Sequence, residues 1–244
     1  MSAIFWTGLS FLLLLAAPGG RRHPRLIGLA ALLFGLVGLL LSLPFWYPPL
    51  KLGLHYNWTG KLLSIVVFLG LIYGFRVVSP AEAGLVRPAP GSLRWVLPVV
   101  LGLAALGFTA GFLERHTHSG ASPGWEDNLY QLTMPGLEEE LFFRGVWLGL
   151  LARVFPRTLP LPGTRTSWGG VVGLVLFVLV HVLSFDQGLR QWLPTVHFAW
   201  GNVAGVALLG TLFLWVRERT GSTLAAAATH NLMNFAQTLA MTLP

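Results

Sequence analysis

The chain has 244 residues, of which 54% are apolar and only 10% are charged, and its mean hydropathy is +0.68. A soluble domain carries about a quarter charged residues to cover its surface, so this composition excludes a soluble globular protein. The formal net charge is +7 and cysteine is absent, which excludes a disulfide scaffold, a thiolate metal site and a cysteine nucleophile.

Apolar stretches suited to transmembrane helices recur along the whole chain. Crossing about 30 Å of hydrocarbon takes around 20 mostly apolar residues, and we find about eight such stretches between polar segments. They predict an all-α polytopic membrane protein, a bundle of about eight transmembrane helices in a single domain over residues 1–244. The expected spans are 2–17, 26–43, 62–75, 95–112, 129–153, 168–185, 193–216 and 222–243.

The basic residues in the loops predict the orientation of the chain. No Lys or Arg precedes the first span, whereas Arg21, Arg22 and Arg25 follow it, so we interpret it as a retained span with the N-terminus outside. Most basic residues then face the cytoplasm, and the Gly-, Leu- and Arg-rich composition favours a bacterial inner membrane. The positive charge therefore reflects topology, and membrane lipid, not nucleic acid, is the expected partner. The basic residues left outside are Lys51, Lys61, Arg115 and Arg190.

Charged residues interrupt the fifth span. Glu138, Glu139 and Glu140 are followed by Arg144. An ionisable side chain inside a span costs several kcal/mol unless it is paired or hydrated. Glu140 and Arg144 are four apart and share a helix face, whereas Glu139 points about 100° away from Glu140. A buried ion pair that sets the helix register explains Glu140 and Arg144 but leaves Glu139 without a partner.

Two later spans carry histidines at helical spacing from other notable residues. Phe177 and His181 lie one turn apart, and so do His230 and Asn234. A single membrane histidine more often hydrogen-bonds a neighbouring helix than acts as a catalyst. At about 1.5 Å per residue, however, Glu139, His181 and His230 all reach the middle of the membrane. We therefore expect three helices to bring these groups to one water-filled cavity.

This set of side chains suits hydrolysis. A carboxylate and an imidazole that share a water can act as a general base, and imidazole and carboxamide donors can stabilise an oxyanion. No serine, threonine or cysteine accompanies them as a nucleophile, which favours direct attack by water. The pattern indicates hydrolysis of an amide within or beside the membrane.

The motifs also resemble those of a known family. Glu139-Glu140-xxx-Arg144, Phe177-xxx-His181 and His230-xxx-Asn234, in this order on late helices, resemble the three signature motifs of the CPBP family. This family of CAAX proteases and bacteriocin-processing enzymes, also called Abi proteases, includes the Ras converting enzyme. The resemblance covers residues 127–243 as the catalytic core, with 1–113 as N-terminal scaffold helices. It implies an intramembrane endopeptidase that acts on a membrane-tethered or prenylated protein or peptide.

The resemblance also implies roles for single residues. Glu139 and His181 would activate the water, and His230 and Asn234 would form the oxyanion site. Arg144 would hold Glu140 and shape the pocket. The expected catalytic residues are thus Glu139, Glu140, His181, His230 and Asn234, with Arg144 and Phe177 in support.

The use of a metal and the role of one acid stay open at this point. Glu139, His181 and His230 form a chemically adequate zinc set. The chain has no HExxH pair, and Asn234 is a poor zinc ligand but a good oxyanion donor, so we favour a metal-free mechanism without a cofactor. Glu138 lies outside the Glu-xxx-Arg motif, and no role is assigned to it.

Two other classes of function remain as alternatives. Buried Glu, Arg and His residues also mark proton-coupled transporters and channels, although such proteins usually carry charges in both halves. A non-catalytic immunity or scaffold protein could retain the same motifs. The substrate is likewise open between a prenylated CAAX end, a bacteriocin leader and a C-terminal sorting tail.

Overall fold

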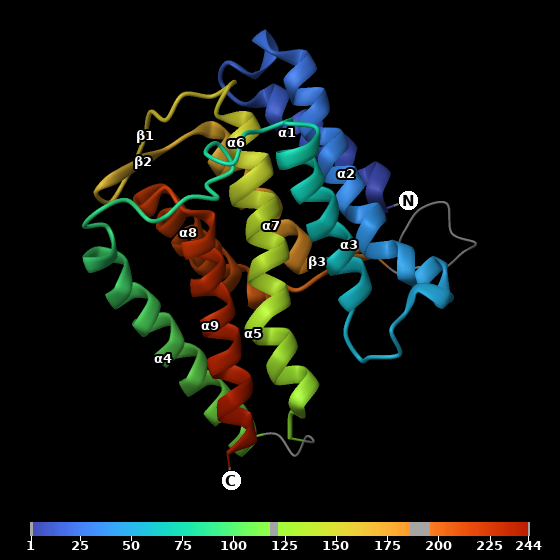
Figure 1. Cartoon of the computed structure of the whole chain (residues 1–244), viewed down its shortest axis with the longest axis vertical. Coiled ribbons are helices and arrows are strands. Elements are labelled where there is room, and N and C mark those ends of the chain that lie inside the picture. The colour runs from blue at the N-terminus through green and yellow to red at the C-terminus, as the bar shows by residue number, and fades with distance from the viewer. Residues whose placement is uncertain (1, 118–121, 186–195, 244) are drawn as a thin grey trace.

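Helices make up most of the chain. The computed structural model describes residues 2–117, 122–185 and 196–243, which form an all-α bundle with two short hairpins (Figure 1). The prediction of an all-α polytopic membrane protein is confirmed. The α-helices are α1 (Ser2–Ala16), α2 (Pro24–Trp46), α3 (Trp58–Leu69), α4 (Leu93–Thr117), α5 (Trp125–Glu140), α6 (Leu148–Leu151), α7 (Trp168–Val182), α8 (Val203–Thr220) and α9 (Thr223–Thr242).

Shorter elements connect or extend these helices. Two π-helical segments continue α3 and α5 without a break, and three 3-10 turns lie in loops. Each hairpin is a two-stranded antiparallel ladder. The π-helical segments are η3 (Gly70–Gly74) and η4 (Leu141–Trp147), the 3-10 turns are η1 (Gly20–Arg22), η2 (Pro48–Leu50) and η5 (Trp200–Asn202), and the strands are β1 (Leu159–Leu161), β2 (Thr164–Thr166), β3 (Leu183–Phe185) and β4 (Val196–Phe198).

The apolar character of the helices suits a membrane. By length and composition, α2, α4 and the segment Trp200–Thr220 could each cross it. Three shorter apolar helices, Ala3–Ala16, Trp58–Gly74 and Trp168–Val182, accompany them. Most expected spans therefore correspond to helices.

The prediction of helix is wrong for β3 and β4. Residues 183–185 and 196–198 were expected to continue two helical spans, but they pair with each other, with Leu183 opposite Phe198. The amide N–H of Ala199 also donates to the carbonyl of Val182 at 2.9 Å, so the ladder satisfies backbone groups that a helix would otherwise satisfy. As a result α7 ends at Val182 and α8 begins only at Val203. The start of the seventh expected span, residues 193–195, lies outside the described residues.

Side-chain caps fix where the site-bearing helices begin. Ser167 accepts a hydrogen bond from the amide of Gly170 at the start of α7, and Ser222 accepts one from Ala225 at the start of α9. Such caps satisfy amides that have no partner inside the helix. Gly221, with φ of 71°, makes the sharp turn between α8 and α9 in a conformation that glycine adopts most easily.

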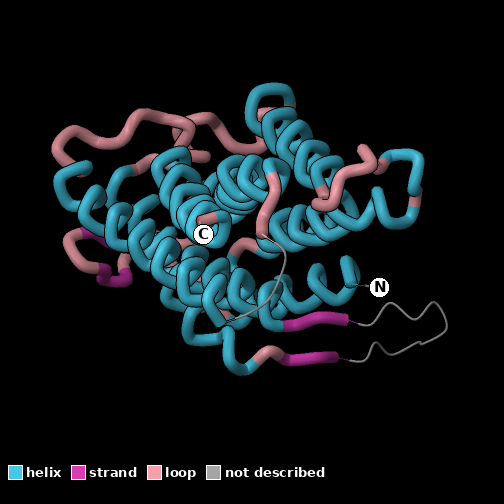
Figure 2. Tube along the Cα trace, turned by 90° about the horizontal axis from the view of Figure 1, so that it is seen from below, coloured by secondary structure: helices cyan, strands magenta, loops and turns pink. Residues whose placement is uncertain are grey.

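The helices form two groups around η4. In Figure 1, α9 lies between α4 and α5, and α1, α2 and α3 lie on the other side of α5. Seen from below in Figure 2, the paired strands β3 and β4 project beside the helices at the edge of the bundle. The C-terminal part of the chain thus packs against the N-terminal helices through the continuous helix that α5 and η4 form.

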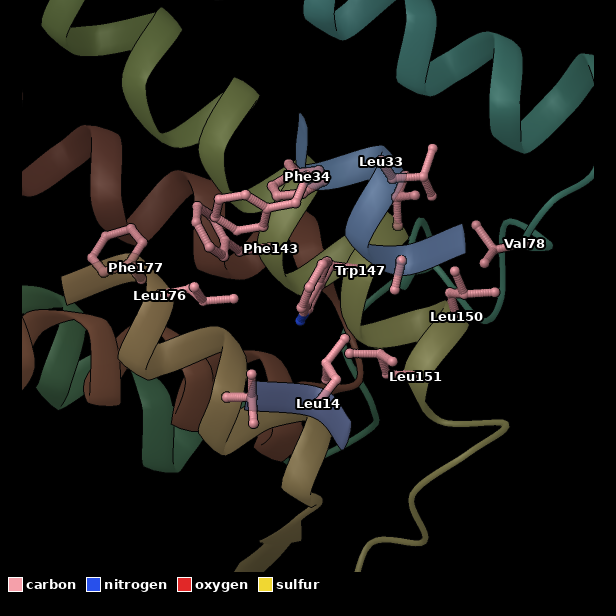
Figure 3. Packing of buried hydrophobic residues seen from close by; sticks show 14 of the residues in the cluster. Leu14, Leu33, Phe34, Val78, Phe143, Trp147, Leu150, Leu151, Leu176 and Phe177 are labelled. Carbon is pink, nitrogen blue, oxygen red and sulfur yellow. The ribbon is translucent and has the colours of Figure 1, made fainter. Parts of the chain in front are cut away.

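An aromatic core joins these two groups. The ring of Phe34 on α2 lies edge-on to the rings of Phe142, Phe143 and Trp147 on η4, with centroid distances of 5.3 to 5.8 Å. Phe143 in turn meets Phe177 of α7 at 5.3 Å. Figure 3 shows Phe34, Phe143 and Trp147 converging, with Phe177 beyond them. This buried contact fixes η4 against α2 and α7.

Candidate active site

Glu139 and His181 meet across α5 and α7. Oε2 of Glu139 lies 3.5 Å from Nε2 of His181. The other ring nitrogen of His181, Nδ1, donates to the carbonyl oxygen of Phe177 at 2.7 Å. Because a carbonyl can only accept, that contact assigns a proton to Nδ1, and in the neutral ring Nε2 then directs its lone pair toward Glu139. With the neutral imidazole, two acceptor atoms therefore face each other.

Glu140, Arg144 and His230 form a second, closed cluster. Nε of Arg144 lies 3.2 Å from Oε2 of Glu140, as the spacing predicts, and Nδ1 of His230 lies 3.1 Å from Oε1. Arg144 also donates to the carbonyl of Gly210 on α8 at 2.9 Å. All three charged or polar side chains are nearly inaccessible to solvent, and Glu140 is fully buried. The ring of Phe213 stacks on His230 at 4.4 Å and holds its plane.

Phe177 contacts residues of both clusters. Its ring centroid lies 4.4 Å from that of His181 and 6.4 Å from that of His230. The guanidinium of Arg144 lies 4.4 Å from the same ring, within the range of a cation–π contact. Phe177 is thus a shared packing partner of the two histidines.

The backbone changes its winding where the site lies. The α-helix α5 ends at Glu140, and the π-helix η4 starts at the next residue. Wider π turns expose backbone carbonyls and occur often at functional sites. The carbonyl of Arg144 accepts from Nε of Arg217 at 3.0 Å and from the hydroxyl of Thr223 at 3.1 Å. Groups on α8 and α9 therefore stabilise this segment.

Close packing brings α9 against α5. A Cβ on Gly136 would lie 2.6 Å from the carbonyl oxygen of Ala227 and 2.9 Å from Cβ of His230, so only glycine fits. The amide of Gly136 donates to Oδ1 of Asn231 at 2.7 Å, which ties the two helices together. This contact holds His230 beside Glu140.

Asn234 forms its hydrogen bond with a residue of neither cluster. It is half-buried on α9, one turn beyond His230, and its Nδ2 donates to Oε1 of Gln131 on α5 at 3.1 Å. Gln131 was not among the expected site residues, since an isolated glutamine before the acidic cluster carries no motif. The structure therefore brings together Glu139 with His181 and Glu140 with Arg144, Phe177 and His230, and it places Asn234 on Gln131.

Lys61 of α3 does not lie in a loop as its position in the sequence predicted. It was expected in an outside loop, yet it is 9% exposed, and its Nζ lies 2.8 Å from Oε1 of Glu139 and 3.2 Å from Oε2 of Glu138. The first half of the chain thus contributes a buried charge. The charges of the fifth span could have indicated this contact, because three adjacent acids and one arginine require a further cation. Glu138, for which no role was assigned, is the second anchor of Lys61.

A cavity of about 310 Å³ opens beside Glu139 and His181. Its polar end is formed by these two residues with Lys61 and Glu138, whereas α1, α2 and η4 supply an apolar wall. His230 and Asn234 are not among the described residues that line it. The lining is Trp6, Phe34, Val37, Gly38, Leu41, Ser42, Lys61, Glu138, Glu139, Phe142, Phe143, Val180 and His181.

The three residues of the alternative zinc set belong to two different clusters. Within residues 2–117, 122–185 and 196–243, no group of three His, Asp or Glu side chains could hold a metal ion. Phe177 contacts both His181 and His230, and His230 directs Nδ1 to Glu140. In this arrangement the three side chains are engaged with other groups of the protein.

Comparison with known proteins agrees with the motifs. Residues 126–236 match the family model described as Rce1-like, type II CAAX prenyl endopeptidase Rce1-like. No curated protein and no solved structure gives a significant match. The matched region contains Glu139, Arg144, His181, His230 and Asn234. Residues 126–236 are therefore similar to the Rce1-like type II CAAX prenyl endopeptidases, and this match supports the resemblance to the CPBP family.

Proposed function

We propose that this chain is an intramembrane endopeptidase that uses a water activated by Glu139 and His181. The observation that carries the proposal is the pair formed by Oε2 of Glu139 and Nε2 of His181, 3.5 Å apart at the polar end of the cavity. A water that donates one hydrogen to each acceptor keeps its oxygen lone pairs free for attack.

Glu139 accepts a proton from the water during the attack and later returns it. The water oxygen bonds to the carbonyl carbon of the substrate while one water proton passes to Oε2 of Glu139, and the carbonyl becomes an oxyanion. Glu139 then returns the proton to the amide nitrogen as the carbon–nitrogen bond breaks, which releases an amine and a carboxylic acid. General acid–base catalysis of this kind contributes about 10²- to 10⁴-fold.

His230 and Asn234 supply the oxyanion donors in this proposal, which requires the substrate carbonyl to reach them beyond the residues that line the cavity. With Nδ1 directed to Glu140, the free Nε2 of His230 donates to the oxyanion when the ring carries both protons. The Nδ2 group of Asn234 joins it after exchanging its bond with Gln131 for one with the substrate. Glu140 and Arg144 position His230 and touch no substrate.

The substrate enters from the lipid. We propose a prenylated or otherwise membrane-tethered peptide, cleaved near its C-terminus, because Trp6, Phe34, Val37 and Leu41 form an apolar wall beside Glu139. We further propose an orientation with the N-terminus outside, in a bacterial inner membrane, and cleavage without a metal ion.

A reconstituted cleavage assay tests this function. Purified protein in liposomes is given internally quenched peptides with a farnesylated CAAX end, the same end without the prenyl group, or an acyl-anchored leader, and mass spectrometry locates the cut. We expect cleavage of a lipid-anchored peptide by the wild type and none by Glu139→Gln. Equal product from the wild type and Glu139→Gln, or no product from any peptide, overturns the proposal.

A further inference from the structure

The first half of the chain reaches the candidate active site through one side chain, Lys61. Its Nζ contacts Oε1 of Glu139 at 2.8 Å, and it is held from the other side by Oε2 of Glu138 at 3.2 Å. Lys61 and Glu138 are both buried, so the contacts are not loosened by solvent. A carboxylate held by one oxygen has its plane and its second oxygen fixed as well.

The two oxygens of Glu139 therefore have different surroundings. Oε1 accepts from Lys61, whereas Oε2 is buried and accepts no hydrogen bond from the part of the chain that the structure describes. Oε2 instead lies 3.5 Å from Nε2 of His181. The oxygen that Lys61 leaves free is thus the one that faces His181 and the cavity.

The first turn of α3 is anchored so that Lys61 keeps this place. Oδ1 of Asn57 caps the helix at the amide of Gly60, and Nδ2 of Asn57 donates to the carbonyl of Leu41 on α2. The indole N–H of Trp58 donates to Oε1 of Glu126 at 3.1 Å, at the start of α5. Both helices that flank α3 therefore fix the position from which the lysine side chain extends.

The positive charge of Lys61 also compensates the negative charge of the site. Glu138 is buried, the adjacent Glu139 is half-buried, and Arg144 is engaged by Glu140. Two buried like charges without a partner repel each other and favour protonation of one of them. A protonated Glu139 could not accept a proton from water.

From these contacts we infer that Lys61 is a positioning residue of the protease site, which holds Glu139 by Oε1 and presents Oε2 to the attacking water, with Glu138 as its anchor. The inference rests on the proposed function. It assigns Lys61 an action through Glu139 and no contact with the substrate, so its loss should slow the chemical step and leave substrate binding unchanged.

Steady-state kinetics on the farnesylated quenched peptide test this role. In Lys61→Ala we expect kcat to fall about 10- to 100-fold, within the range of general base catalysis, while KM changes less than about twofold, as for a step lost only in the transition state. Lys51→Ala is the matched control, since Lys51 is the other lysine of the chain and is exposed on a loop. It should keep the wild-type kcat and KM.

Chemical rescue separates positioning from a purely structural role. Alanine at position 61 lacks three carbons and the ammonium group, which propylammonium replaces in the cavity. We expect propylammonium to restore kcat of Lys61→Ala in a saturable manner, and 1-propanol, of the same size without charge, to have no effect. Lys61→Arg, which keeps the cation, should retain more activity than Lys61→Ala.

Glu138→Gln gives a second route if Lys61→Ala does not fold. This nearly isosteric change removes the negative charge of the anchor and weakens its hold on Lys61, so kcat should fall several-fold without a change in thermal stability as large as that of Lys61→Ala. Wild-type kcat in both variants overturns the positioning role alone, provided that Glu139→Gln is inactive. Wild-type kcat in Glu139→Gln as well overturns the proposed function. Activity lost in Lys61→Ala that propylammonium does not restore and Lys61→Arg does not retain also counts against the role.

Discussion

Oε1 of Glu140 lies 3.1 Å from Nδ1 of His230, although the two residues are 90 positions apart in the chain. Glu139, the preceding residue, instead meets His181 and Lys61. Adjacent carboxylates thus serve different histidines, because successive residues of a helix point about 100° apart. Substitutions of Glu139 and of Glu140 are therefore expected to affect the activity differently.

Glu139→Gln should abolish cleavage, because an amide cannot take the proton from water. Glu140→Gln should retain part of the activity, because it still accepts one hydrogen bond from His230 and acts on the substrate only through that ring. We expect a fall in kcat of about 10²-fold or more for the first variant and a smaller one for the second. Glu114→Gln, an exposed change on α4, is the matched control. Equal losses in the two site variants would contradict the division of roles.

Arg144→Met should lower the stability of the fold. It leaves Glu140, which is fully buried, without its cation, and removal of one partner of a buried pair costs about 3–5 kcal/mol. The double variant Arg144→Met with Glu140→Leu removes both charges and should recover part of that loss. Thermal unfolding in detergent, followed by circular dichroism, measures both. A double variant no more stable than Arg144→Met would show that the pair is not the cause.

The sequence predicts the parts of this site that depend on local periodicity. The apolar runs predict the helices, and the four-residue spacing predicts that Glu140 meets Arg144, as it does at 3.2 Å. Spacing says nothing about partners on distant helices, so the contact of Lys61 with Glu139, 78 positions away, was missed. The link between Asn234 and Gln131 was missed for the same reason.

Backbone irregularities explain the other differences. A π-helix differs from an α-helix in that its backbone hydrogen bonds join residues five apart, and in η4 the carbonyl of Arg144 also accepts from Arg217 and Thr223, far along the chain. The strands β3 and β4 are apolar runs that periodicity alone does not distinguish from helix. Their pairing ends α7 one residue after His181, which leaves that side chain about one-third exposed at 34%.

Gly136→Ala should separate α5 from α9. The added Cβ would meet the carbonyl oxygen of Ala227 at 2.6 Å, and backbone cannot move aside as a flexible side chain can. Overpacking costs about 1–3 kcal/mol, which outweighs the gain of less than about 1 kcal/mol from the better helix propensity of alanine. Gly102→Ala, on α4 with no atom within 4 Å of the new Cβ, should be neutral or slightly stabilising. Unfolding temperatures compare the two, and a stable Gly136→Ala would refute this account of the close approach.

The loop ion pair between Glu82 and Arg153 should give the fold a small dependence on acid pH. Hydrogen bonds from Arg153, at 2.8 Å to each carboxylate oxygen, lower the pKa of Glu82 to about 2. A carboxyl group with a lowered pKa stabilises the fold above its unfolded pKa of about 4.5, and this stability is lost as the pH falls toward 2. The side chains are 34% and 40% exposed, so the effect should stay within about 1 kcal/mol. Glu82→Gln should lower the unfolding temperature at pH 7 but not near pH 2, and an equal difference at both pH values would exclude this pair as the source.

Metal chelators should leave the peptidase activity intact. Nδ1 of His181 and Nδ1 of His230 are already engaged by Phe177 and Glu140, and Glu139 is held by Lys61, so the proposed chemistry needs only water and these side chains. We expect full cleavage of the farnesylated peptide after incubation with 1,10-phenanthroline and dialysis against EDTA, and no stoichiometric metal in the active protein by mass spectrometry. Glu139→Gln in the same buffers controls for uncatalysed cleavage. Activity that disappears with the chelator and returns with added zinc would instead mean that the helices rearrange to bring Glu139, His181 and His230 onto a metal ion, and Lys61 would then have to release Glu139.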